Sequence, residues 1–342
     1  MRLHTKKYNS SEKIHHLEGN IIISSFFNKV SFKKGETKIE ITLPSSFFEK
    51  IFGLFRISRR LLRLDMCTVL FIEQQLVLVR KGFVYHYNLV TNRLTKTLKL
   101  KQCDNILHQS ICQSPDGKLF FGEYGGNPKR EPVNIYCSED FGKSWNVIFK
   151  FKAGQIRHIH GCYYDKFTNR IWTLTGDFKN ENIIQISDLS FKKNEIIGDG
   201  SQKFRAVNLF FEKGEVHWMM DSPLEKSYQY TYNRATKITS KGQLFNGPIW
   251  FLKRLSDGYY LAGSSVEKGI GVLTNTACLY ISKDLKNWEC VREFEKDKLP
   301  MPYFKWGVLA FSNGKQSSKA FSIHFEGLKG VDGKSYICSI EN

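Results

Sequence analysis

Acidic residues recur at one position of a repeated pattern in this sequence. Five segments each contain an alternating apolar and polar stretch, a tight turn, a second such stretch and then a carboxylate. The carboxylates are Glu123, Asp177, Asp221, Glu267 and Glu326, at intervals of 44 to 59 residues. Two suitably spaced carboxylates can serve as general acid and as base or nucleophile in cleaving a glycosidic bond. Each acid could instead cap a strand end by accepting backbone hydrogen bonds.

Histidine, arginine and tryptophan side chains accompany these acids. His158 and His160 are two residues apart in a predicted strand, so both side chains point to the same face. Such a pair near a carboxylate can position a ligand, transfer a proton or hold a divalent metal. We expect no cofactor, with a metal at His158 and His160 as the lesser alternative. Further candidates for ligand contact are Arg130, Arg157, Arg205, Trp250, Lys305 and Trp306.

Strands must position these residues. The turns PDGK, EKGE, SDGY and SNGK supply the positive φ of tight hairpins, and a further strand pair follows each acid. Four strands per repeat are typical of a propeller blade. The sequence predicts a single all-β domain over 1–342, a six-bladed β-propeller with seven blades as the alternative, the repeated blades spanning 65–342. The acids, histidines and arginines should then converge at one mouth of the central channel.

One turn carries a fuller motif. Ser138, Asp140, Gly142 and Trp145 match the pattern S-x-D-x-G-x-[ST]-W, and a copy one residue shorter contains Ser282, Asp284 and Trp288. The serine and aspartate should bond the turn's own backbone, and the glycine should supply a positive φ.

On these residues the chain resembles the sialidase-like Asp-box propellers, in which the motif is structural. The stretch from Arg157 to Asp177 also resembles uncharacterised Asp-box proteins associated with bacterial surface-polysaccharide synthesis. The resemblance implies a carbohydrate-active propeller, although no arginine triad of a sialidase can be placed in this sequence.

The first 64 residues lie outside the repeats. Strands near 20–43 are expected to pair with the C-terminal strands and close the ring. Residues 46–64 form a predicted amphipathic helix, with arginines on one side and large apolar residues on the other. This helix should either dock over one end of the propeller or lie on a membrane surface.

The amino-acid composition limits the kinds of partner that this chain can bind. The net charge is +18, which favours an anionic partner, but the lysines are scattered and no nucleic-acid-binding module is present. We therefore expect an anionic oligosaccharide and no nucleic acid. The eight cysteines are isolated, without a CxxC pair, and neither a secretory signal nor a membrane-spanning run is evident. These features predict reduced cysteines and a cytoplasmic protein, in peripheral contact with a membrane if 46–64 binds one.

The leading functional prediction is cleavage or transfer of a glycosidic bond in an anionic glycan, as part of bacterial surface-polysaccharide metabolism. Glu123, Asp177 and Asp221 would supply acid and base groups, and His158 and His160 would position the substrate. The remaining predicted contacts to the substrate come from Arg130, Arg157, Arg205, Trp250, Glu267, Lys305, Trp306 and Glu326. The alternatives are a non-catalytic glycan-binding or scaffolding propeller and, third, a metal-dependent polysaccharide lyase.

Overall fold

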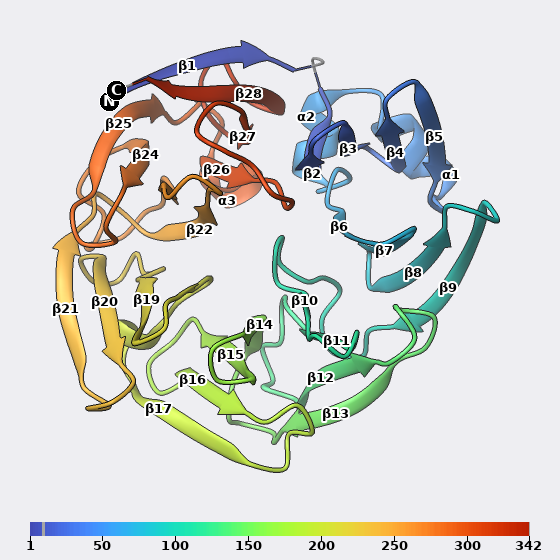
Figure 1. Ribbon diagram of the computed structural model, residues 1–342. Helices are drawn as coiled ribbons and strands as arrows, with labels where there is room; N and C mark the ends of the chain where they lie inside the picture. Colours follow the sequence, from blue (N-terminus) through green and yellow to red (C-terminus); the bar gives the residue numbers. More distant parts are fainter. Residues whose placement is uncertain (9–10, 342) are drawn as a thin grey trace. The chain divides into compact units, whose positions relative to one another are not determined.

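The computed structural model describes residues 1–8 and 11–341. The described strands pair antiparallel in seven four-stranded sheets (Figure 1). This is the blade composition of an all-β, seven-bladed β-propeller. The prediction of six blades is therefore wrong, and the seven-bladed alternative is confirmed. The chain divides into two compact units, a first unit of residues 1–67 with 245–342 and a second unit of residues 68–244.

The second unit contains four blades, each made of four consecutive strands. In chain order these strands are β6 (Thr68–Ile72), β7 (Gln75–Arg80), β8 (Phe83–Asn88), β9 (Arg93–Lys99); β10 (Cys112–Gln113), β11 (Leu119–Gly122), β12 (Val133–Ser138), β13 (Asn146–Phe151); β14 (His158–Asp165), β15 (Arg170–Gly176), β16 (Asn182–Ser187), β17 (Asn194–Gly200); and β18 (Phe210–Phe211), β19 (Glu215–Met219), β20 (Tyr228–Asn233), β21 (Thr239–Leu244). Apolar residues from neighbouring blades share one core, as where Phe120 and Ile135 pack with Ile159 and Ile171. This packing holds the starts and ends of β14 and β15 in place.

The first unit contains three blades. Their strands are β2 (Lys13–Glu18), β3 (Ile21–Phe26), β4 (Lys29–Lys34), β5 (Thr37–Thr42); β22 (Ile249–Arg254), β23 (Tyr260–Ser264), β24 (Thr276–Ser282), β25 (Glu289–Glu295); and β26 (Val308–Phe311), β27 (Phe321–Glu326), β28 (Lys334–Glu341) with β1 (Arg2–Lys7). The expected pairing of strands near 20–43 with the C-terminal strands is wrong, because these residues belong to a complete blade of their own. The strand that completes the last blade is β1, which pairs with β28 from Arg2↔Glu341 to Lys7↔Tyr336.

Two short helices replace the single helix expected over residues 46–64. They are α1 (Phe47–Phe52) and α2 (Arg56–Leu61). A capping box between Ser46 and Glu49 begins α1, and the chain turns between the helices at Gly53. A Cβ at Gly53 would lie 2.8 Å from the Phe27 ring, so this close approach requires glycine. Two further single turns are α3 (Met301–Phe304) and a 3₁₀ turn, η1 (Gln202–Phe204).

The two hairpins with the Asp-box pattern adopt the expected local bonds. In the first, which joins β12 and β13, the Ser138 hydroxyl accepts from the Gly142 N–H at 2.8 Å. Asp140 accepts from the Ser144 N–H at 2.9 Å, and Gly142 has φ +90°. The Trp145 ring packs edge-on to Phe121 over this hairpin, with centroids 4.7 Å apart.

The second hairpin joins β24 and β25 and uses the same chemistry. Asp284 accepts from the N–H groups of Lys286 and Asn287 at 2.9 and 2.8 Å. These bonds to the ionised form hold the pKa of Asp284 well below its usual value. The Ser282 hydroxyl accepts from the Leu285 N–H at 3.0 Å, and Trp288 is buried against Phe245. Both hairpins are therefore stabilised by local hydrogen bonds and one ring.

One sequence expectation about cysteine is overturned. Cys278 and Cys290, on the paired strands β24 and β25, form a disulfide with their Cα atoms 6.0 Å apart. The expectation of eight reduced cysteines is wrong for this pair because the hairpin brings their side chains to one place. The other six are in no disulfide among the described residues, and five of those are buried. No helix among the described residues is long and apolar enough to span a membrane.

Candidate functional site

The candidate site lies in the second unit, at one end of β14 and β15. His158 opens β14 and pairs in register with Gly176, the last residue of β15, so Asp177 follows beside it. A bulge between Ile159 and Gly161 shifts this register, and His160 lies within it. A Cβ at Gly176 would lie 2.6 Å from Asn182 Oδ1, so a larger residue here would displace the Asn182 side chain. The antiparallel pair thus brings two histidines and a carboxylate together, as predicted from their spacing.

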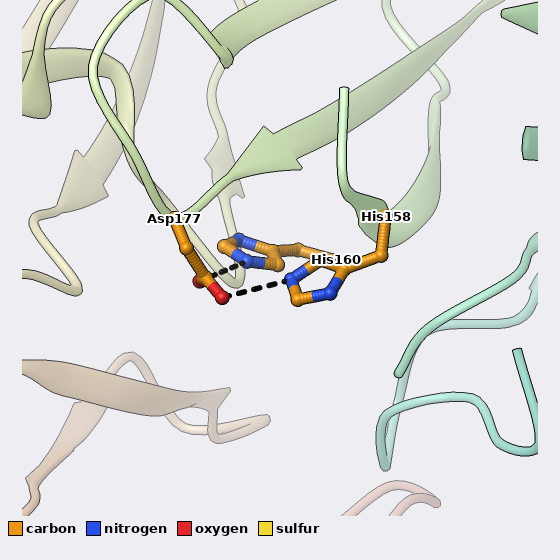
Figure 2. Close-up of side chains that lie close together, drawn as sticks. All are labelled: His158, His160 and Asp177. Carbon is orange, nitrogen blue, oxygen red and sulfur yellow. Dashed lines mark hydrogen bonds and ion pairs between the residues drawn. The ribbon is translucent and has the colours of Figure 1, made fainter. Parts of the chain in front are cut away.

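Four side chains surround the Asp177 carboxylate. Arg157 Nη1 lies 3.0 Å from Oδ2 and Arg205 Nη2 lies 3.1 Å from Oδ1. His158 Nε2 lies 3.4 Å from Oδ2 and His160 Nε2 lies 3.3 Å from Oδ1 (Figure 2). Burial alone would raise the pKa of Asp177, but the approach of the two histidines outweighs it and holds that pKa well below its usual range. Asp177 is therefore an ionised carboxylate and cannot donate a proton near neutral pH.

The second ring nitrogen of each histidine fixes its tautomer. His158 Nδ1 lies 2.8 Å from the Gly125 carbonyl oxygen, and His160 Nδ1 lies 2.7 Å from that of Ala206. A carbonyl oxygen only accepts, so both Nδ1 atoms carry the hydrogen. Burial lowers the pKa of His160, which favours its neutral form. The contact between His160 Nε2 and Asp177 Oδ1, 3.3 Å apart, is favourable when Nε2 carries a hydrogen that it donates to the carboxylate, or when a cation lies between the two atoms.

This arrangement fits a divalent metal ion. The Nε2 atoms of His158 and His160 and an oxygen of Asp177 all lie within 4.8 Å of one another. Histidines that bind metals commonly donate the other ring N–H to a backbone carbonyl, as both do here. The buried Nε2 of His158 has no hydrogen bond to any described residue. These three residues could therefore hold a metal.

Arg205 links two of the predicted acids. It follows the 3₁₀ turn η1 (Gln202–Phe204), and its Nε lies 3.5 Å from Asp221 Oδ2. Its Nη1 also donates to the Asp177 carbonyl at 3.1 Å. Asp177 and Asp221 thus share one guanidinium. The structure brings together Asp177, Asp221, His158, His160, Arg157 and Arg205, as the repeated spacing predicted.

Glu123 has a different environment from Asp177. Its carboxylate is fully buried and accepts from three backbone N–H groups and one phenol. The donors are Lys101 N (2.7 Å), Gln102 N (3.3 Å), Asn134 N (3.1 Å) and Tyr136 Oη (3.1 Å). This is the strand-end cap that the sequence left as the alternative, so we assign Glu123 no part in ligand chemistry.

An exposed aromatic side chain lies between two guanidinium groups next to Asp177. The Phe178 ring is 47% exposed, with the guanidinium carbons of Arg130 and Arg157 5.2 and 5.6 Å from its centroid. Arg130 pairs with Glu181 at 2.5 Å. The Tyr124 ring packs on His158, with centroids 4.3 Å apart. Sequence reasoning missed Phe178 and Tyr124, although each directly follows one of the repeated acids.

The other predicted ligand contacts lie in the first unit. The Trp250 indole donates to Glu267 Oε1 at 2.9 Å and contacts Trp306 edge-on, with centroids 5.2 Å apart. Lys305 Nζ lies 5.0 Å from the Trp306 ring centroid. Glu326 lies 4.0 Å from His324 Nε2. The expected convergence of these residues with the Asp177 cluster stays a prediction.

Comparisons with known proteins define the fold. No protein-family model and no curated protein matches the sequence. Among solved structures, the chain is similar to the extracellular domain of BT4673 from B. thetaiotaomicron, described once as a one component system and once as a hybrid two component system. The two likenesses have TM-scores of 0.57 and 0.54, each at 12% identity, and cover 100% and 98% of this chain. The chain spans 40% of each neighbour's length. At this identity the likeness shows the β-propeller fold alone.

Proposed function

We propose that this propeller binds an anionic carbohydrate at the surface formed by Arg130, Arg157 and Phe178 without cleaving it. The proposal rests on the ionisation of Asp177 and on the hydrogen bonds that surround Glu123. Glycoside hydrolysis needs one carboxyl group that releases a proton and another that acts as base or nucleophile. Asp177 is held ionised by His158 and His160, and both carboxylate oxygens of Glu123 already accept hydrogen bonds from the surrounding protein. That pair therefore supports binding, the alternative to cleavage.

The chemistry of the exposed surface indicates the ligand class. An exposed phenyl ring can stack on a sugar ring, and guanidinium groups beside it can pair with a carboxylate or sulfate group. Of Arg130 and Arg157, Arg157 is the more available for a ligand, because its side chain is 31% exposed. Three other side chains also contact its partner Asp177, so Asp177 would keep those contacts if Arg157 bound a ligand. The chain's net charge of +18 favours an acidic ligand over a neutral one.

The two Asp-box hairpins support a place among the sialidase-like Asp-box propellers. Their Ser138–Gly142 and Asp284–Asn287 bonds are those expected of the motif. We assign the ligand to bacterial surface polysaccharide because the stretch from Arg157 to Asp177 resembles Asp-box proteins associated with the synthesis of that polysaccharide. This assignment concerns only the source of the ligand. The contacts proposed for Phe178 and the neighbouring arginines do not depend on it.

Titration calorimetry with sialylated and uronate oligosaccharides, beside neutral oligosaccharides, tests the proposal. We expect the acidic ligands alone to bind, and Phe178→Ala and Arg157→Met each to lower affinity about tenfold, as loss of a stacked ring or a charged hydrogen bond would. Phe167→Ala is the matched control, because this partly exposed ring also has a cationic neighbour, Lys166, 5.1 Å away. Equal weakening in the control, or no binding at all, contradicts the proposal. Release of shortened sugars would restore the glycosidase hypothesis.

A metal-dependent lyase is the second candidate, favoured by the convergence of His158, His160 and Asp177. A bound divalent cation would withdraw charge from a uronate carboxylate, the chemistry that a lyase requires, while Arg157 would orient the same group. Metal analysis of the purified protein and calorimetry with ZnCl₂ and MnCl₂ test this. Stoichiometric binding that His158→Ala abolishes, together with ultraviolet-absorbing unsaturated products, would favour the lyase. Absence of metal binding would exclude this candidate.

A further inference from the structure

Helices α1 and α2 expose an unusual number of large apolar side chains. Nine side chains between residues 47 and 62 have exposed fractions between 44% and 73%. They are Phe47, Phe48, Ile51, Phe52, Leu54, Phe55, Ile57, Leu61 and Leu62. Folded monomers rarely leave so many large apolar side chains of one short segment in water, and such a segment normally marks a contact with a partner or a membrane. We call these nine residues the apolar face.

The arginines of α2 hold this face outward. Arg56 binds Asp332 through two nitrogens, at 3.1 and 2.8 Å, and also pairs with Asp65 at 2.7 Å. Arg59 is buried and also bonds Asp65, at 3.1 Å, while buried Arg60 pairs with Asp297. The polar side of α2 is therefore the side fixed to the protein.

Further contacts make this orientation rigid. Arg59 Nη1 donates to the Gly53 carbonyl at 2.8 Å, and its guanidinium lies 4.3 Å from the centroid of the Phe26 ring. Arg60 Nε donates to the Phe304 carbonyl at 3.1 Å. Inward rotation of the apolar side chains would break these bonds and bury unpaired charges, at high cost. The exposure of the apolar face is thus imposed by the fold.

We propose that the apolar face inserts into the surface of an anionic lipid bilayer and anchors the propeller there. Short helices with aromatic and aliphatic residues on one side lie in the interface between headgroups and acyl chains. Lys50 is exposed on α1, and Arg63 is exposed two residues after the end of α2. Neither has an acidic partner among the described residues, and both can contact anionic headgroups. The anchor is peripheral, because α1 and α2 have six residues each.

Charge argues against a second copy of the chain as the occupant. Each chain carries +18, so two copies joined at this face would repel each other, whereas an anionic bilayer attracts both the patch and the whole molecule. Lipid also accepts an irregular apolar surface without the matching shape that a protein partner must supply. The lipid surface is therefore the occupant that fits both the charge and the shape.

Sedimentation with vesicles tests this on the full chain. We expect binding to vesicles of mixed phosphatidylcholine and phosphatidylglycerol, and weaker binding to phosphatidylcholine alone or at high salt. Each large side chain moved out of water contributes about tenfold or more to affinity, so the triple variant Phe48→Ser/Leu54→Ser/Phe55→Ser should abolish binding. The control is Ile270→Ser, an apolar residue outside these helices that is more exposed still, at 91%; this variant should bind normally.

Two further measurements keep the outcome decisive. Thermal unfolding should show the triple variant folded, because these side chains are exposed. In the variant Phe55→Trp, the tryptophan emission should shift to shorter wavelength when mixed vesicles are added. Vesicle binding that the triple variant retains overturns the proposal. Absence of vesicle binding, together with a wild-type dimer that the triple variant separates, also overturns it and assigns the face to a second copy.

Discussion

The substitution Glu123→Gln separates a structural carboxylate from a catalytic one. Glu123 lies in the blade β10–β13 and is fully buried. Oε1 accepts from the N–H groups of Lys101 and Gln102 and from the Tyr136 hydroxyl, and Oε2 accepts from the Asn134 N–H. Glutamine has nearly the same shape but keeps only one accepting oxygen. Whichever way the amide turns, its NH₂ group then faces a backbone donor.

The magnitude follows from these bonds. A hydrogen bond to a charged group contributes about 1.5–3 kcal/mol, and a buried donor left without an acceptor costs about 1–3 kcal/mol. Removing a buried charge returns part of this by relieving its desolvation. We therefore expect Glu123→Gln to lower the free energy of unfolding by about 3 kcal/mol. Affinity of the remaining folded protein for an acidic oligosaccharide should be unchanged.

Urea unfolding followed by the fluorescence of buried Trp172 and Trp218 measures this loss. Glu139→Gln is the control, because Glu139 lies in the same blade, is mostly exposed and forms an exposed ion pair with Lys118. Its change should therefore stay within about 0.5 kcal/mol. A Glu123→Gln protein with wild-type stability but no ligand binding or turnover would refute the assignment of Glu123 as a cap.

The other predictions concern stability and covalent state. Burial lowers the pKa of Lys253 from 10.5 to about 8. Between these pH values the unfolded chain binds more protons than the folded one, so the free energy of unfolding should rise with pH by about 3 kcal/mol. Urea unfolding at a series of pH values should show this rise in the wild type and not in Lys253→Met. Gly142→Ala should lower the free energy of unfolding by about 2 kcal/mol in thermal unfolding, because φ is +90° and the new Cβ would lie 2.6 Å from a valine methyl. Gly214→Ala, in open space, is the control and should leave stability unchanged. Equal effects of the two substitutions would contradict this reasoning. Thiol titration of the unfolded, unreduced protein should find six free thiols and eight after reduction, while eight in both states would refute the Cys278–Cys290 bond.

Local patterns determined the blades and their hairpins. The Ser138 and Asp140 bonds close within a few residues, so the sequence motif contains everything needed to predict them. The same holds for His158 and Asp177, because an antiparallel hairpin necessarily brings the start of its first strand beside the end of its second. These predictions succeeded because each depends on neighbours in the chain.

The number of blades depended on distant pairing. The blade β2–β5 lacks the repeated acid at the end of its second strand, so the repeat pattern did not identify it as a blade. The last blade is completed by β1 on β28, from opposite ends of the chain. Pairing between such distant strands depends on the packing of all the intervening blades, which no local pattern describes.

Tertiary partners also decided the roles of individual charges. Glu123 and Asp177 occupy the same repeated position, yet backbone N–H groups surround the first and two histidines with two arginines surround the second. The sequence likewise showed that 46–64 has an arginine side and an apolar side. Which side faces outward was decided by Asp297 and Asp332, more than 230 residues away, since a buried guanidinium is stable only where the fold supplies a carboxylate.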